Sequence, residues 1–75
     1  MKSKVDQFVI NHVKEKRIEK KMTQADLAYE LNVSAGFIGK VESSKYAAHY
    51  NIKHINNLAK ILKCSPKDFL PKDPL

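Results

Sequence analysis

The sequence is poor in the features that define several common classes of protein. Its 75 residues include one cysteine, which excludes a disulfide framework and disfavours a cysteine-based structural zinc site. Its apolar runs reach only about three residues, as at Phe8-Val9-Ile10, so none is long enough to span a bilayer. The basic N-terminus leads into mixed charge and not into the apolar region of a secretory signal. These absences predict a single small domain in the cytoplasm, with no membrane partner.

Groups of residues typical of enzymes and metal sites are also absent. His12, His49 and His54 lack the spacing of metal ligands, and none stands beside a nucleophile in a recognisable arrangement. We therefore expect no catalytic activity, no metal and no cofactor.

Positive charge is abundant, and it lies in the two flanks of the sequence. There are 14 Lys and Arg residues against 8 Asp and Glu residues, which gives a formal net charge of +6. Residues 1–21 hold seven cations and three acids, residues 40–75 hold the same numbers, and residues 22–39 hold only Asp26 and Glu30. This excess predicts an anionic partner, although the charge alone does not identify it.

Apolar residues recur at helical spacing along the chain, which predicts an all-α fold of five short helices. They are expected at about residues 3–20, 23–32, 34–42, 51–62 and 65–70, in one domain covering residues 1–70 with a short tail at residues 71–75. Side chains that cap helix N-termini stand at Ser3, Thr23, Ser34 and Ser65. The expected core consists of Val5, Phe8, Val9, Val13, Leu27, Ala28, Leu31, Phe37, Ile38, Val41, Ile55, Leu58, Ala59 and Leu62.

The most informative unit is the pair of helices within residues 23–42, joined by the short turn Asn32-Val33-Ser34. Ala28 leaves room for the two helices to cross closely, while Ile38 and Val41 pack the second helix onto the first. One face of the second helix is then left free to project outward, as in a DNA-binding helix-turn-helix. The basic flanks favour that interpretation.

This unit resembles the helix-turn-helix domain of Cro and the phage repressors. The residues that carry the resemblance are Thr23-Gln24-Ala25-Asp26-Leu27-Ala28, Asn32-Val33-Ser34, Ile38, Glu42, Leu58-Ala59-Lys60-Ile61-Leu62-Lys63-Cys64-Ser65 and Phe69-Leu70, so it covers about residues 9–70. It implies a compact five-helix domain of the lambda-repressor-like type. Proteins of this family usually bind operator DNA as two-fold dimers and mostly repress transcription.

The resemblance also implies which residues contact DNA. Gln24 would hydrogen-bond a phosphate, and the helix at residues 34–42 would lie in the major groove. Lys40 could donate to guanine, and Ala35 could touch a thymine methyl group. The implied DNA-binding residues are Gln24, Ser34, Ala35, Gly36, Phe37, Lys40, Ser43, Lys45 and Tyr46, with a place in the core as an equal alternative for Phe37.

Three features depart from the family pattern. Asn32 and Ser44 stand where the family usually has glycine, and Ser44 implies a different exit from the helix at residues 34–42. The segment from Ser43 to Asn51 is longer than usual, and both glycines of the chain, Gly36 and Gly39, lie in the expected recognition helix. A glycine in a helix costs about 1 kcal/mol relative to alanine, so this pair suggests close approach of the backbone to DNA or a helix ordered only on binding. We hypothesise that recognition relies on DNA shape and phosphate contacts more than on side-chain hydrogen bonds.

Two further expectations come from matching positions in the family. Arg17 and Glu42 match an arginine and a glutamate that often form a partly buried ion pair, against the alternative of two solvated surface charges. Cys64 matches a position of small aliphatic residues, so we expect it in the core, with redox sensing as the alternative.

Two functional hypotheses follow. The leading one is a sequence-specific transcriptional regulator, a repressor that binds double-stranded DNA as a homodimer. The alternative is a protein-interaction module, such as an antitoxin that neutralises a partner toxin. The few hydrogen-bond donors at residues 35–39 favour the alternative, as do Phe69, Leu70 and Leu75, which could exceed what one small domain buries and form a dimer or partner interface.

Overall fold

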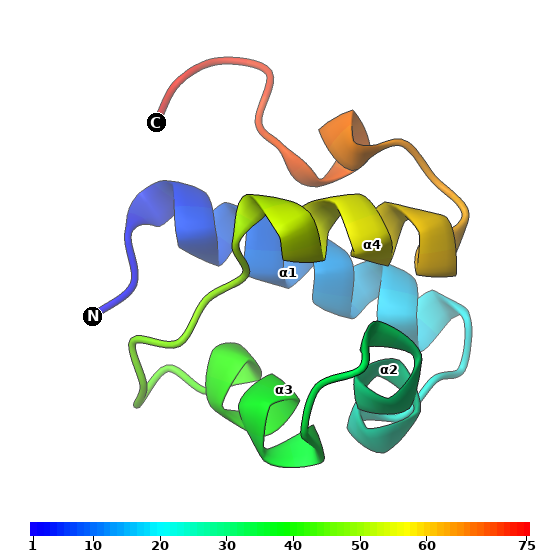
Figure 1. Ribbon diagram of the computed structural model, residues 1–75. Helices are drawn as coiled ribbons and strands as arrows, with labels where there is room; N and C mark the ends of the chain where they lie inside the picture. Colours follow the sequence, from blue (N-terminus) through cyan, green and yellow to red (C-terminus); the bar gives the residue numbers. More distant parts are fainter.

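A computed structural model describes all residues from 1 to 75 and shows an all-helical fold without strands. The helices are α1 (Lys4–Glu19), α2 (Gln24–Leu31), α3 (Ala35–Glu42) and α4 (Ile52–Leu62), followed by a 3-10 helix, η1 (Pro66–Phe69). In Figure 1, α1 and α4 cross the middle of the view, α2 and α3 pack below them, and the C-terminal segment passes above. None of the helices is both long and apolar enough to cross a membrane.

The helix boundaries follow from local capping, as the sequence predicts. The side chains of Ser3, Thr23 and Ser34 each accept a hydrogen bond from the backbone N–H three residues further on. At α2 the reciprocal bond is also present, because the Asp26 carboxylate accepts the Thr23 N–H at 2.8 Å. Asn32 ends α2 in the left-handed conformation, with φ of 61°. The tight turn between α2 and α3 is therefore confirmed.

The expectation of a fifth α-helix is wrong, because residues 66–69 form a single turn of 3-10 helix. Ser65 caps this turn and Pro66 opens it, but Pro71 follows so closely that no ladder of α-helical hydrogen bonds can build up. The turn has a packing role, since it contacts α1 and α4 and buries Phe69 completely. Phe69 is thus no surplus apolar residue, whereas Leu70 and Leu75 are exposed.

The hydrophobic core is a single cluster of 14 buried residues drawn from all five helical elements and the loop before α4. Two expectations for α1 are corrected, because Val5 is exposed and Phe8 is only partly buried. The buried stripe of α1 instead follows Val9, Ile10, Val13 and Arg17. Cys64 is partly buried and packs against the core, which supports its predicted structural role.

Candidate nucleic-acid interface

The helix α3 is held by one face and leaves the other open. Ile38 and Val41 are completely buried, and they anchor α3 against the rest of the core. At 100° per residue, the opposite face of α3 consists of Ala35, Gly36, Gly39 and Lys40. That face carries only one long polar side chain, so the helix backbone is unusually accessible along it.

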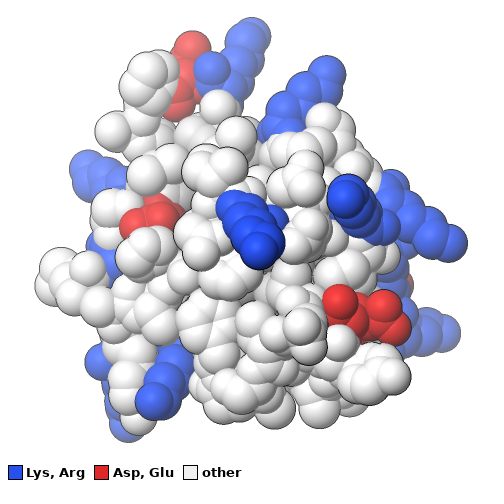
Figure 2. Space-filling model, viewed as in Figure 1, with Lys and Arg blue, Asp and Glu red and all other residues white.

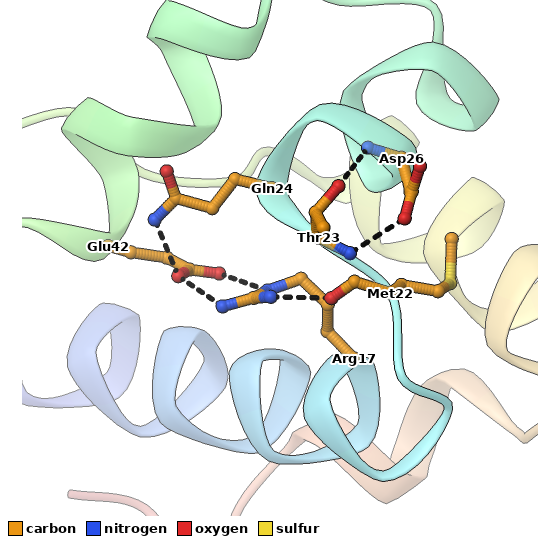
Figure 3. Close-up of polar contacts among 6 residues, drawn as sticks. All are labelled: Arg17, Met22, Thr23, Gln24, Asp26 and Glu42. Carbon is orange, nitrogen blue, oxygen red and sulfur yellow. Dashed lines mark hydrogen bonds and ion pairs between the residues drawn. The ribbon is translucent and has the colours of Figure 1, made fainter.

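A buried ion pair fixes the C-terminal end of α3 to α1. The Arg17 guanidinium donates from Nε and Nη2 to the two carboxylate oxygens of Glu42, each at 2.9 Å (Figure 3). The side chains of Arg17 and Glu42 are only 10% and 3% exposed, so this is a bidentate pair shielded from water. Nη1 of Arg17 also donates to the carbonyl of Met22 at 2.7 Å. The predicted Arg17–Glu42 pair is thus confirmed, and it ties α1, the α1–α2 connection and α3 together.

The same carboxylate also holds Gln24, the residue expected to contact a phosphate. The Gln24 amide nitrogen donates to Glu42 Oε1 at 3.0 Å, as Figure 3 shows. Gln24 is exposed at the start of α2, and its side-chain oxygen lies near Gly39 of α3. Sequence reasoning missed this contact, because no periodicity relates positions so far apart on different helices.

Neither glycine of α3 is required by the fold itself. The helix is continuous through both of them. A Cβ atom added at Gly36 would meet nothing closer than 3.9 Å, and one added at Gly39 would lie 3.5 Å from Gln24 Oε1, an ordinary contact. The chain therefore gains nothing in its own packing from these two positions. The lack of side chains at these two positions therefore affects the exposed surface of α3 and not the packing of the core.

The loop that follows α3 gathers the remaining expected contact residues. Lys45 and Tyr46 are exposed, and the Ser43 hydroxyl accepts the Lys45 N–H at 3.2 Å. The ammonium of Lys40 lies 5.6 Å from the centre of the Tyr46 ring, within range of a cation–π interaction. Tyr50 anchors the far end of the loop in the core, where it is 4% exposed.

Phe37 points away from the open face of α3 and into an aromatic cluster. Its ring centre lies 6.2 Å from that of Tyr50 and 5.3 Å from that of His54. Phe37 is partly buried against the core, which favours packing over contact with a sugar–phosphate wall. Sequence reasoning missed Tyr50, since it lies in a loop with no helical periodicity to mark it as buried.

His54 links this cluster to the start of α4. Its Nδ1 atom accepts the Asn51 N–H at 3.1 Å, and the Asn51 side chain accepts the His54 N–H at 2.8 Å. Burial lowers the pKa of His54, and repulsion from Lys53 and His49 adds to the effect. Burial likewise raises the pKa of Tyr50, whose hydroxyl has no hydrogen-bond partner.

The predicted DNA-contact residues therefore come together, apart from Phe37. Ser34, Ala35 and Gly36 are exposed at the start of α3, where Ser34 also caps the helix. Lys40, Ser43, Lys45 and Tyr46 lie at its end and in the loop beyond. Positive charge is not confined to this surface, because Figure 2 shows Lys and Arg side chains projecting from most edges of the visible face.

Comparisons with known proteins show the family of the chain. A family model described as the Cro/C1-type HTH DNA-binding domain matches residues 12–72. Among solved structures, the controller protein C.Esp1396I bound to a 19 base pair DNA duplex has a TM-score of 0.74 at 33% identity, over 89% of this chain and 87% of that one. No curated protein sequence matches this chain.

Two more distant structures share the fold. The restriction-modification controller protein C.AhdI from Aeromonas hydrophila has a TM-score of 0.71 at 22% identity, covering 84% of this chain and 92% of that one. The biofilm regulator SinR, solved in complex with DNA, has a TM-score of 0.70 at 18% identity, covering 81% and 95%.

Removing the Glu42 carboxylate should strongly destabilise the fold. In Glu42→Ala the buried Arg17 guanidinium loses its partner, so we expect the free energy of unfolding to fall by about 3–5 kcal/mol. Urea denaturation followed by circular dichroism measures this change. The control is Glu30→Ala, which removes an exposed glutamate from α2 and should change stability by less than about 0.5 kcal/mol. Equal stabilities of the two variants would contradict the dependence of the buried Arg17 guanidinium on its carboxylate partner.

Protonation of His54 should destabilise the protein below its ordinary pKa of 6.5. Because its pKa is lower in the folded chain, the unfolded chain takes up the proton first as the pH falls. Stability should therefore be complete above pH 6.5, decrease between that value and the lower folded pKa, and then level off. Urea titrations of wild type and His54→Gln across this range should diverge, with His12→Gln as the control. Parallel curves for wild type and His54→Gln would exclude the effect.

Proposed function

Because the chain belongs to the Cro/C1-type helix-turn-helix family of DNA-binding domains, we propose that it is a sequence-specific transcriptional regulator that acts as a repressor. The observation that carries this proposal is the packing of α3, which is held on one face and exposed on the other. Its inner face is fixed by Ile38, Val41 and the Arg17–Glu42 pair, while its outer face is not packed against another helix and touches only the side chains of Gln24 and Tyr46. A rigid helix with one open face suits insertion into the major groove of B-DNA.

We propose that Gln24 binds the DNA backbone beside that groove. Its amide nitrogen carries two hydrogens, and the bond to Glu42 uses one of them, so the other can donate to a phosphate oxygen. The exposed N–H groups in the first turn of α2 favour the same anion. The ion pair therefore positions a phosphate contact as well as the recognition helix.

Few side chains would be available to recognise the DNA sequence. On the outer face of α3, Lys40 can donate to guanine and Ala35 can contact a thymine methyl group. Ser43, Lys45 and Tyr46 in the loop beyond would contact the sugar–phosphate backbone. With two glycines between these contacts, we propose that the helix approaches the DNA closely and that shape contributes much of the specificity.

The protein is proposed to act as a homodimer. In a two-fold dimer on B-DNA, the two copies of α3 would lie about 34 Å apart, one helical turn of the duplex. A protein 33% identical to this chain was solved on a duplex of 19 base pairs, long enough for two half-sites at that spacing. The exposed apolar side chains of Leu70 and Leu75 are available for an interface, although Phe69 is not.

Selection of bound duplexes from a random pool tests the function. We expect enrichment of a two-fold-symmetric motif with few strongly specified positions and retention that falls steeply with salt. A long, sharply defined consensus would contradict recognition by shape. Failure to enrich any duplex, together with salt-insensitive retention on heparin, would contradict DNA binding and favour the protein-interaction alternative.

Two lysines should have separable effects in the same selection. Lys40→Ala removes the one cation of the outer face of α3, so it should relax base preference at one position of each half-site. Lys45→Ala removes an expected phosphate contact, so it should weaken binding to all duplexes alike and reduce the salt slope by about 1. Equal effects of both variants on every duplex would contradict these roles.

Gly36→Ala should separate stability from binding. Replacing a helical glycine with alanine should raise the free energy of unfolding by about 0.5–1 kcal/mol, since the added methyl meets no atom closer than Ser34 Oγ at 3.9 Å. The same methyl group would obstruct a closely approaching duplex, so affinity should fall. Asn56→Ala, at an exposed site of α4, is the control for added helix propensity and should leave affinity unchanged. Undiminished affinity in Gly36→Ala would rule out close approach at this position.

A further inference from the structure

The N-terminal segment makes a polar contact with the end of the recognition helix. The Lys2 ammonium donates to the carbonyl of Ser43 at 2.6 Å and also to the carbonyl of Tyr46. These partners lie 41 and 44 residues away along the chain. Lys2 stands before α1, so the contact joins a segment outside the helices to the loop that follows α3.

The position of the contact suits a cation. Ser43 is the C-cap of α3, where backbone carbonyls lack partners within the helix and the helix dipole is negative. An ammonium group has three hydrogens, and Lys2 directs two of them to this end of the helix. The Ser43 N–H already bonds the Lys40 carbonyl, and Lys2 adds a partner for the free carbonyl of Ser43 itself.

The loop has little else to hold it in this region. No backbone–backbone hydrogen bond involves residues 44–50. The only side-chain bonds within the loop are short-range, from the Lys45 N–H to Ser43 and between His49 and the carbonyl of Ala47. Tyr50 secures the far end by burial. At the near end, Lys2 is the one long-range hydrogen-bond donor that reaches the loop.

The segment held in this way carries the expected backbone contacts. Residues 43–46 include Lys45 and Tyr46, and the Tyr46 ring in turn lies beneath the Lys40 ammonium. We propose that Lys2 is a positioning residue for DNA binding, which fixes the loop at residues 43–46 so that Lys45 and Tyr46 are preset to meet the phosphate backbone. This inference rests on the function proposed above. It adds a contribution from the N-terminal segment that acts through the loop.

The test compares the affinity of Lys2 variants for one selected duplex at fixed salt. Lys4→Gln is the matched control, since Lys4 is an exposed cation two positions away that makes no side-chain hydrogen bond or ion pair. We expect Lys2→Gln to lower affinity about threefold to tenfold more than Lys4→Gln, the range usual for members of one network. Lys2→Arg should restore affinity, because a guanidinium can also donate to two carbonyls. Equal losses in Lys2→Gln and Lys4→Gln would overturn the positioning role.

A double-mutant cycle with Lys45→Ala separates positioning from direct contact. If Lys2 acts through the loop, Lys2→Gln should lose most of its effect once Lys45 is absent. Strictly additive losses would mean that Lys2 acts independently of Lys45, which overturns the inference. If the wild-type protein binds no duplex, the proposed function is contradicted. If the wild-type protein binds but the losses of the two variants add, only the role of Lys2 is contradicted.

Discussion

The orientation of α3 depends on the bidentate pair between Arg17 and Glu42. A buried guanidinium without its carboxylate is strongly unfavourable, so the pair favours the packing of α1 and α3 that brings the two groups together. Desolvating both ions offsets much of their attraction, and the pair therefore contributes geometry more than net stability. Through the further bonds to Met22 and Gln24, that geometry reaches the start of α2. One carboxylate thus links α1, the start of α2 and the end of α3.

The net charge of the protein and the outer face of α3 contribute to the proposed DNA binding in different ways. The formal charge of +6 provides long-range attraction to a polyanion, yet α3 itself contains only one lysine and one glutamate, and that glutamate is buried in the ion pair. Under the proposed function, attraction to DNA and discrimination between sequences would therefore reside in different parts of the molecule. The flanks carry the cations, and the short α3 presents bare backbone between Ala35 and Lys40. A surface of this kind favours fit to the groove over a dense set of hydrogen bonds.

The parts of the fold that sequence could predict are the parts governed by neighbouring residues. The caps at Thr23 and Ser34, the left-handed Asn32 and the helices between them depend on residues a few positions apart. The Arg17–Glu42 pair was predictable only through the family resemblance. Tyr50 in the core and Phe69 beneath its 3-10 turn depend on what distant elements leave open, and periodicity does not report that. The same reason hid the Gln24–Glu42 and Lys2 contacts, which join positions with no local relation.

The contact between Lys2 and the loop after α3 also has a consequence for the order of assembly. By joining positions 41 and 44 residues apart, it closes a ring that contains α1, α2 and α3. Closing so long a ring costs chain entropy, and two surface hydrogen bonds return little of it until those three helices have packed. The contact is therefore expected to form late in folding, after these helices have packed. The N-terminal segment therefore binds the loop after α3 only when the helix-turn-helix is already folded.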